Sequence, residues 1–494
     1  MISSVITKEE KRTLWSVIMA SSVGTLIEWY DFYIFGSLAT ILSQQFFPQT
    51  NPTAAFLSTL ATFAAGFVVR PFGAIVFGRL GDLVGRKYTF LVTLILMGGS
   101  TFAIGIVPSY SSIGIFAPLI VLLLRLLQGL ALGGEYGGAA TYVAEHAPAA
   151  RRGYYTSYIQ TTATLGLFVS IGVILAVRHW IGVEEFNSWG WRIPFILSSV
   201  LVGISIYIRL RMKESPLFAK LKAEGKTSKN PLKESFGKKE NLMLVLIALF
   251  GATAGQGVVW YTGQFYAMTF IEKTCQVDFV QTRDIIAIAL VIGTPFFIVF
   301  GAWSDRVGRK YIMMVGMILA VFLYRPIYRE MMNQADLTKK IELTDQRIEG
   351  PVVSTDNASS SVIQKKIFAD KTLATVTLID GKETKKEILL GNTSYWFMIA
   401  LVTIQVLLVT MVYGPIAAFL VELFPTRIRY TSMSLPYHIG NGIFGGLTPF
   451  IATYLAGAFD DPLAGLWYPI GVAAICFVIG MALLSNRKRA EVMD

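Results

Sequence analysis

A ten-residue string that occurs twice in related form constrains this chain more than any other feature. Gly78–Lys87 reads GRLGDLVGRK, and Gly301–Lys310 reads GAWSDRVGRK. Each copy follows a long apolar segment and leads into the next one. A second pair of related strings follows in the same order, at Glu145–Ser157 and at Glu422–Ser432. Two ordered pairs indicate a membrane protein with two related halves in the same orientation and a cleft between them.

The apolar composition supports a membrane protein. Hydrophobic residues make up 54% of the chain and charged residues only 15%, whereas soluble domains carry about 25% charged residues. We therefore expect an all-α membrane protein, with twelve transmembrane helices in two pseudo-symmetric six-helix halves. The segments long enough to cross the ~30 Å hydrocarbon core are residues 14–47, 54–80, 88–107, 113–144, 153–178, 190–211, 241–271, 284–304, 311–326, 394–423, 431–457 and 464–485.

Lysine and arginine gather in alternate connections between these segments. By the positive-inside rule, both termini are expected in the cytoplasm. The predicted organisation is an N-terminal half (1–211), a cytoplasmic linker (212–240), a C-terminal half (241–485) and a cytoplasmic tail (486–494). Topology thus accounts for the net charge of +11 better than nucleic-acid binding does.

The second half contains an extra polar stretch, residues 327–393, on the predicted external side. Apolar and polar residues alternate over Thr372–Ile379, Asp380-Gly381 is a turn signal, and Lys382–Leu390 can return along the first strand. The stretch predicts a small external β-hairpin, with a disordered loop as the alternative.

With these motifs the chain resembles the major facilitator superfamily, whose signature follows the second and eighth helices. Further strings resemble its metabolite:proton symporters, which move small carboxylates, shikimate-like acids, or proline and betaines. They lie at Ile27–Phe32, Arg70–Gly73, Arg125–Gly129, Gly133–Gly138 and Ile439–Gly446. The resemblance implies a monomeric transporter in the cell (inner or plasma) membrane that imports a small organic acid or zwitterion with protons. It covers nearly the whole chain outside the insertion.

Charged residues inside the spans supply the candidates for proton coupling. Asp31 lies midway along the first span and Arg125 near the middle of the fourth, so the two can meet in one half. A carboxylate that gains and loses an arginine neighbour can take up and release a proton. In related sugar:proton symporters, an Asp of the first helix and an Arg of the fourth have these roles, whereas a fixed ion pair is the structural alternative. Glu28 is a further candidate, with helix packing against a buried polar partner as its alternative. Glu135 lies among glycines nearer the cytoplasm and can serve either the proton route or a gate, with a structural role as its alternative.

Arg70 is the candidate anchor for an anionic substrate, because its guanidinium offers a planar fork to a carboxylate. Pairing with Glu28 or Asp31 is the alternative, and Pro71 predicts a kink in the second span. Other polar residues inside spans can line a wet cavity or form interhelical hydrogen bonds: Tyr30, Tyr33, Gln128, Gln160, Gln256, Tyr261, Gln264, Tyr437 and Asn441. The resemblance favours those on the seventh and eleventh helices, which usually face the cavity.

Acidic and basic residues at the predicted cytoplasmic ends of the spans form a candidate gate. Ion pairs among them would close the inner mouth, whereas retention of topology by the basic residues alone is the alternative. These residues are Asp82, Arg86, Glu145, Arg152, Asp305, Arg309, Glu422 and Arg429.

The chain lacks the sequence patterns of several enzyme classes. It has no nucleophile elbow, zinc motif or phosphate loop, so we expect neither an enzyme, nor a cofactor, nor a metal. Two other functions remain open: a proton-coupled efflux antiporter of the same fold, and a transporter-like receptor that binds an external partner through residues 327–393.

Overall fold

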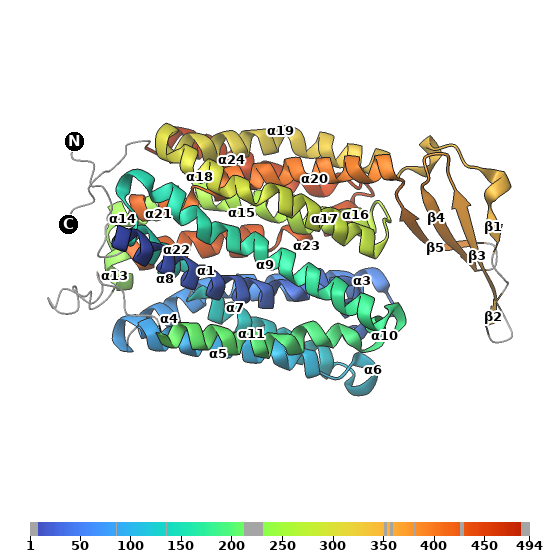
Figure 1. Ribbon diagram of the computed structural model, residues 1–494, viewed down its shortest axis with the longest axis horizontal. Coiled ribbons are helices and arrows are strands. Elements are labelled where there is room, and N and C mark those ends of the chain that lie inside the picture. Colours follow the sequence, from blue (N-terminus) through green and yellow to red (C-terminus); the bar gives the residue numbers. More distant parts are fainter. Residues whose placement is uncertain are drawn as a thin grey trace.

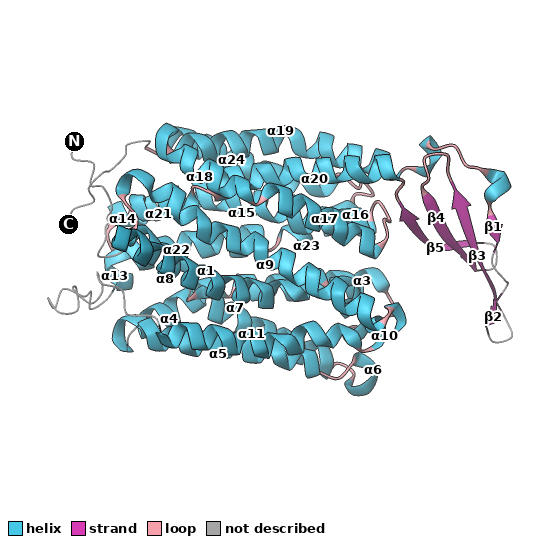
Figure 2. Ribbon diagram, viewed as in Figure 1, coloured by secondary structure: helices cyan, strands magenta, loops and turns pink. Residues whose placement is uncertain are grey.

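In the computed structural model, long helices run side by side and a β-sheet projects from one end of the bundle (Figures 1 and 2). The structure describes residues 8–84, 86–134, 136–211, 231–349, 353–355, 359–379, 382–424 and 429–485. We call the end where α1 begins and α24 ends the terminal end, and the opposite end the sheet end.

The first half contains the six predicted spans, several of which consist of two helices. They are α1 (Lys8–Ser37) with α2 (Ala39–Phe46), α3 (Pro52–Val68) with α4 (Arg70–Val84), α5 (Arg86–Ile106), α7 (Phe116–Gly133) with α8 (Tyr136–His146), α9 (Arg152–Ile181) and α11 (Ile193–Arg211). Short helices α6 (Tyr110–Ile113) and α10 (Val183–Ser188) lie between spans. The second span breaks at Val69, two residues before Pro71, as the missing N–H of that proline predicts.

The second half repeats this arrangement, with a short helix α13 (Pro231–Phe236) before it. Its helices are α14 (Lys239–Ala248), α15 (Ala254–Tyr261), α16 (Ala267–Lys273), α17 (Phe279–Gly293), α18 (Pro295–Val307), α19 (Arg309–Ala335), α20 (Asn392–Tyr413), α21 (Ile416–Leu423), α22 (Arg429–His438), α23 (Thr448–Ala458) and α24 (Trp467–Leu483). The seventh span contains π-helical segments at Leu249–Thr253 and Thr262–Tyr266, and the eleventh contains one at Ile439–Gly445. Such segments are frequent at functional sites.

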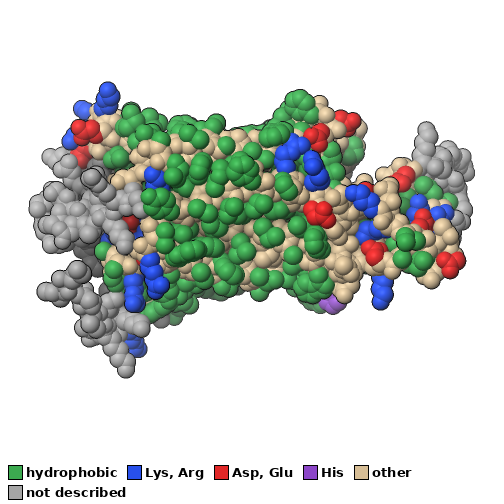
Figure 3. Space-filling model, turned by 90° about the horizontal axis from the view of Figure 1, so that it is seen from above, with side chains coloured by type: hydrophobic (Ala, Val, Ile, Leu, Met, Phe, Trp, Pro, Cys, Tyr) green, Lys and Arg blue, Asp and Glu red, His purple; other side chains and the backbone are tan. Residues whose placement is uncertain are grey.

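The helical body has the surface of a membrane protein. Apolar side chains cover its middle, and most of the charged side chains lie toward its two ends (Figure 3). Nine helical segments of the described residues are long and apolar enough to cross a membrane by themselves. The other predicted spans correspond to α1–α2, α5 and α22–α23. The all-α membrane fold with a small sheet is therefore confirmed.

The insertion forms a larger sheet than the predicted hairpin. Strands β4 (Leu373–Ile379) and β5 (Lys382–Leu389) pair antiparallel as predicted, while the turn at 380–381 lies outside the described residues. The sheet also contains β1 (Ile348–Glu349), β2 (Val353–Thr355) and β3 (Ser359–Ile367), in the order β1-β3-β4-β5 with β2 also on β3. Because α19 continues to Ala335, the first residues of the predicted insertion, 327–335, are helical.

Glycines let the two halves approach at backbone distance. A Cβ atom on Gly153 of α9 would lie 2.5 Å from the carbonyl oxygen of Gly301 on α18. Nearer the middle of the bundle, a Cβ atom on Gly442 would lie 2.5 Å from the carbonyl oxygen of Phe67. Such distances leave no room for a side chain, so these glycines set how tightly the halves close.

Candidate functional site

Arg70 lies at the centre of the bundle in an aromatic box. A Cβ atom on Gly133 of α7 would lie 2.1 Å from the Arg70 carbonyl oxygen, so close helix packing fixes this backbone. The guanidinium carbon lies 4.1 Å from the ring centroid of Phe67, 4.5 Å from that of Phe32 and 5.1 Å from that of Trp29. Arg70 is only 1% exposed, yet its Nε and Nη2 atoms have no hydrogen-bond partner among the described residues. Buried donors without a partner need an explanation, and a bound anion would supply one.

Tyrosine side chains from both halves surround this guanidinium. Those close enough to interact with it electrostatically are Tyr33, Tyr261, Tyr413 and Tyr437. The hydroxyls of Tyr413 and Tyr437 lie 2.6 Å apart, which joins the tenth span to the eleventh. The first half contributes Tyr33 and the second half the other three. Arg70 therefore lies where the halves meet.

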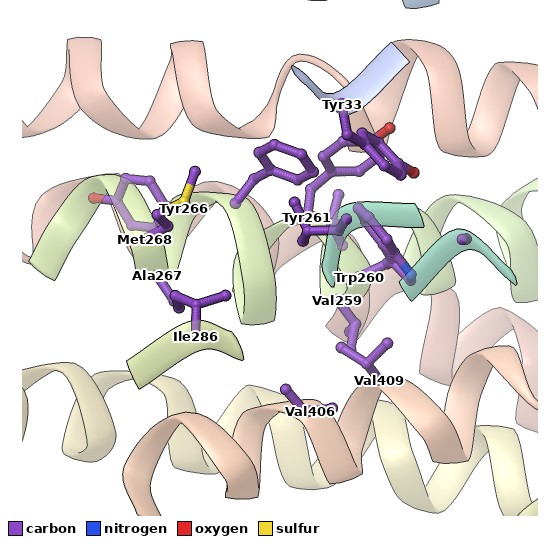
Figure 4. Packing of buried hydrophobic residues seen from close by; sticks show 14 of the residues in the cluster. Tyr33, Val259, Trp260, Tyr261, Tyr266, Ala267, Met268, Ile286, Val406 and Val409 are labelled. Atoms are coloured by element: carbon purple, nitrogen blue, oxygen red, sulfur yellow. The ribbon is translucent and has the colours of Figure 1, made fainter. Parts of the chain in front are cut away.

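Stacked rings extend from this box across the boundary between the halves. Tyr33 stacks on Trp29 of its own helix at 4.9 Å and on Trp260 of the second half at 5.4 Å. Tyr261 meets Phe67 edge to face at 5.1 Å. Figure 4 shows Tyr33 next to Trp260 and Tyr261 within this packing. Tyr33 and Tyr261 were predicted candidates. Trp29, which lies within the Ile27–Phe32 string, and Trp260, which directly precedes Tyr261, were missed.

Arg125 is held entirely within the first half. Its Nη1 donates to Gln128 Oε1 at 2.7 Å and to the carbonyl oxygen of Phe32 at 3.3 Å, and its Nη2 donates to that of Phe63 at 3.2 Å. Gln128 in turn donates to Thr101 at 2.6 Å. Gln128 therefore orients Arg125 in this structure and does not line the Arg70 box.

Asp31 is buried in the same half but does not contact Arg125. It is 1% exposed, and its Oδ1 has no hydrogen-bond partner among the described residues. Its carboxyl faces Ser198 of α11, whereas Arg125 binds the carbonyl oxygen of the next residue in α1. The expected meeting of the two side chains is therefore absent from this conformation. Glu28 is also buried, at 2% exposure, and Glu135 lies outside the described residues.

The polar candidates of the second half form interhelical pairs. Gln256 and Asn441 exchange side-chain hydrogen bonds of 3.0 and 2.9 Å, which join the seventh span to the eleventh. Gln264 donates to Thr164 of α9 at 3.4 Å, a contact between the halves. Both pairs lie in or next to π-helical segments. In this conformation these residues therefore form interhelical hydrogen bonds, which was the alternative to lining a wet cavity.

Two first-half candidates lie elsewhere in the bundle. The Tyr30 hydroxyl donates to the carbonyl oxygen of Pro194 at 2.9 Å and so points toward α11. Gln160 is buried in α9, with 1% exposure. Of the predicted substrate residues, the structure therefore gathers Tyr33, Tyr261 and Tyr437 around Arg70.

The predicted gate joins the two halves at the terminal end. The Asp305 carboxylate accepts the backbone N–H groups of Gly153 and Tyr154, both at 2.9 Å, where α9 begins. Arg309 binds the same carboxylate at 2.6 Å and reaches Glu422 at 3.1 Å. A carboxylate at a helix N-terminus is favoured by the free N–H groups and by the helix dipole.

The remaining gate candidates extend this network in part. Arg152 approaches Glu422 across the halves at 3.5 Å, and Arg429 donates to the carbonyl oxygen of Phe424 at 3.2 Å. A cavity of about 390 Å³ opens beside Arg152, Arg309 and Glu422. The side chains of Asp82, Arg86 and Glu145 lie outside the described part of the structure. Within that part, no group of three or more His, Cys, Asp or Glu residues could hold a metal ion.

A second contact between the halves, at the sheet end, was missed. Glu272, at the end of α16, forms an ion pair with Arg283 of α17 and accepts the Thr40 hydroxyl of α2 at 2.5 Å. Arg283 also donates to the carbonyl oxygen of Ser37 at 3.0 Å. We call Glu272, Arg283, Thr40 and Ser37 the sheet-end latch. The only signal in the sequence was a pair of charges close to the ends of two consecutive apolar segments.

Comparisons with known proteins identify the family. The inner membrane metabolite transport protein YhjE of Escherichia coli K12 is 34% identical over 96% of this chain and 94% of its own length. Residues 16–243 match the family model described as "Sugar (and other) transporter". The chain belongs to the major facilitator superfamily. Other superfamily relatives are the alpha-ketoglutarate permease of E. coli K12, 28% identical over 98% of this chain and 97% of its own, and the proline/betaine transporter of Salmonella typhimurium strain LT2, 29% identical over 96% and 84%.

Solved structures show the same fold. The proton:xylose symporter XylE bound to 6-bromo-6-deoxy-D-glucose aligns with a TM-score of 0.67 and 14% identity, over 97% of each chain. A partially occluded inward-open XylE from E. coli aligns with a TM-score of 0.65. The protein is therefore a multi-pass membrane transporter of a small-molecule metabolite or solute, and not an enzyme.

Proposed function

We propose that this transporter imports a small organic acid or zwitterion together with protons, by alternating access between its two halves. The observation that carries the proposal is the Arg70 guanidinium, buried where the halves meet, with two nitrogen atoms that lack a partner among the described residues. A planar guanidinium binds a carboxylate through two parallel hydrogen bonds. Tyrosines of both halves beside it allow a bound solute to contact both halves at once.

The names of the relatives support this class of substrate. They include an alpha-ketoglutarate permease and a proline/betaine transporter, whose named solutes all carry a carboxylate. The sugar of the structural relative lacks one, and that relative is far more distant in sequence. An acid or zwitterion therefore fits both Arg70 and the nearer relatives.

Binding by purified protein tests the anchoring role of Arg70. Dicarboxylates, keto acids, shikimate, amino acids and betaines would be screened for a thermal shift, followed by titration of the best ligand. Arg70→Gln should weaken its binding by about tenfold or more, because a charge-assisted hydrogen bond contributes roughly 1.5–3 kcal/mol. Arg192→Gln is the matched control, since Arg192 donates to the carbonyl oxygens of Gly105 and Val107 and packs over Trp191, all of them in the first half and none of them in the Arg70 box. Equal affinity of the Arg70 variant and the wild type would refute this role.

For proton coupling we propose Asp31 as the main carrier, with Arg125 as its modulator and Glu28 and Glu135 as further participants. The buried Asp31 carboxyl, with an oxygen unpaired among the described residues, supports this role. In proteoliposomes, Asp31→Asn should abolish accumulation driven by a proton gradient and preserve solute counterflow. Accumulation that persists in this variant would contradict the assignment. Proton movement out of the lumen on solute entry would instead indicate the antiporter.

We also propose that the terminal end faces the cytoplasm and that the protein is a monomer in the membrane. The lysine and arginine bias of the connections supports this orientation, and it puts the sheet outside the cell. Labelling of a cysteine introduced on β5 by a membrane-impermeant reagent in intact cells tests it. Labelling only after lysis would reverse the assigned orientation.

A further inference from the structure

The sheet-end latch depends on the short connection between α16 and α17. Glu272 precedes this connection and Arg283 follows it, and the two must stay aligned to bind Thr40 and Ser37 of the first half. The connection has little regular structure of its own. Something outside it therefore has to fix its path.

Strand β5 of the inserted sheet binds this connection through its backbone. The N–H of Ile388 donates to the carbonyl oxygen of Gln276 at 2.8 Å, and the N–H of Asp278 donates to the carbonyl oxygen of Ile388 at 2.8 Å. Val277 pairs with Ile388 as an isolated parallel bridge. The connection thus lies beside β5 as an additional short strand, on the side away from β4.

A side chain at the start of α17 also binds the backbone directly after β5. Gln281 of α17 accepts the N–H of Leu390 at 2.7 Å and donates to the carbonyl oxygen of Leu390 at 3.0 Å. Gln276 adopts a φ angle of 56°, a left-handed conformation that is uncommon for residues with a side chain. Conformations of this kind persist where the surroundings fix them, and the bond from Ile388 is such a constraint.

The first half also reaches the same region. The ring of Phe279, the first residue of α17, lies close to two guanidinium groups: that of Arg283 at 3.5 Å and that of Arg178 on α9 at 4.2 Å. Lys273 lies 4.9 Å from the ring of Phe56 on α3. The connection held by β5 is therefore flanked on both sides by contacts between the halves.

We propose that the inserted sheet positions the sheet-end latch, with Ile388 and Gln281 as the positioning residues that hold the α16–α17 connection so that Glu272 and Arg283 can close on the first span. The insertion is then a working part of the transport cycle. Weakening the bonds between the sheet and the α16–α17 connection favours the conformation in which the halves are separated at the sheet end. The inference requires only that the halves separate there, and it is independent of the solute carried.

Hydrogen–deuterium exchange of the full-length protein tests this inference without a known substrate. Ile388→Pro removes the one N–H that reaches Gln276 and fits a strand position whose N–H points away from its neighbour strand. Exchange should rise about fivefold in residues 34–42, as loss of one hydrogen bond of about 1 kcal/mol implies. Ile388→Ala keeps the N–H and controls for the loss of the buried side chain, which is 2% exposed and whose truncation has a cost of its own, so it should raise exchange in this segment less than Ile388→Pro does. Glu272→Gln breaks the latch directly and should raise exchange in 34–42 without altering β4 or β5.

Gln281→Leu is a second variant, in case Ile388→Pro fails to fold. It removes both bonds to Leu390 and should raise exchange in 34–42 in the same direction. The inference is overturned if these variants raise exchange only in residues 274–278 and leave 34–42 unchanged. It is equally overturned if Ile388→Ala acts as strongly as Ile388→Pro, or if Glu272→Gln leaves 34–42 protected.

Discussion

The two ends of the bundle are closed by contacts of different kinds. At the terminal end, Asp305, Arg309, Glu422 and Arg152 form a network whose side chains are 7 to 22% exposed. At the sheet end, the Arg283 side chain is 2% exposed and that of Glu272 11%. Water and salt can weaken the first network, whereas the second is nearly dry. The sheet end should therefore tolerate the loss of a partner less well.

The two ends also differ in origin. The terminal network uses the duplicated string of this chain, so its residues are recognisable from the repeat. The sheet-end latch has no counterpart in that repeat, and an inserted domain fixes it instead. The following predictions test this difference, starting with the largest expected effect.

Removal of Arg283 should have the largest effect. Arg283→Met removes the buried ion-pair partner of Glu272 and leaves it with the partly exposed Lys273, at 3.9 Å, so we expect a cost near the lower end of the roughly 3–5 kcal/mol of a broken buried pair. Thermal unfolding in detergent should show a clear fall in the midpoint. The double variant Glu272→Leu with Arg283→Met should recover much of this loss, because no charge remains unpaired. Additive losses in the double variant would show that the residues do not act as a pair.

Removal of Asp305 should have the second-largest effect. Asp305→Ala frees the N–H groups of Gly153 and Tyr154 but leaves Arg309 bound to Glu422, so we expect a cost of about 2 kcal/mol. Hydrogen exchange should rise in residues 152–157 and stay unchanged or fall in residues 34–42, because opening at one end favours closure at the other. Asp305→Asn, which keeps the shape, should have a smaller effect. A rise in exchange in both residues 152–157 and residues 34–42 would argue against two ends that close separately.

Within the sheet, Asp370 should make stability depend on acid pH. Burial raises the pKa of its carboxyl, but hydrogen bonds from Lys340 and Thr372 outweigh burial and hold this pKa below its ordinary value. Its contribution is therefore present above the unfolded-state pKa of about 3.9 and is lost as pH falls through the lower folded-state pKa. Asp370→Asn should cost about 1 kcal/mol at pH 7 and little in strong acid, measured by thermal unfolding. Lys340→Met should lose the same pH-dependent part and, in addition, a constant part from its hydrogen bonds to Thr372 and Ser394. A loss in Asp370→Asn that is independent of pH would contradict this account.

Loss of Arg152 should have the smallest effect. It meets Glu422 at 3.5 Å with both side chains about one-fifth exposed, and such pairs contribute less than about 1 kcal/mol. Arg152→Gln should change exchange in residues 152–157 slightly. At 1 M salt, where the screening length is about 3 Å, the change should shrink to the part due to the hydrogen bond from Arg152 Nε to the carbonyl oxygen of Ala144. A large change in exchange that persists at 1 M salt would show that Arg152 contributes as a buried contact does.

Much of the helical fold was predictable because it depends on local patterns. Apolar length predicted the spans, and the alternation over Thr372–Ile379 predicted the β4–β5 hairpin. The repeated ten-residue string located Asp305 and Arg309, and the second pair of strings located Glu422. Strand β3 was missed because its first half is a run of serines with little apolar alternation. A polar strand of this kind is defined by its partners, which sequence periodicity does not identify.

Several residues of the candidate site were predictable from the sequence, but their contacts were not. Buried charge identified Arg70, Arg125 and Asp31. The partners of Arg125 include the carbonyl oxygens of Phe32 and Phe63, and carbonyl groups of distant helices leave no trace in a sequence. Glu272 and Arg283 were missed because each is ordinary at a helix end until the fold brings them together.

The sheet is covalently continuous with α19 and α20 and hydrogen-bonded to the connection before α17, so it belongs mechanically to the second half. The alternating access that we propose would move the sheet together with the second half, beyond the end of the helical body (Figure 1). An antibody fragment bound to the outer strands of the sheet would make this movement visible in single-particle images. Fixing such a fragment to a surface would let small rotations of six helices be followed as the displacement of one rigid arm.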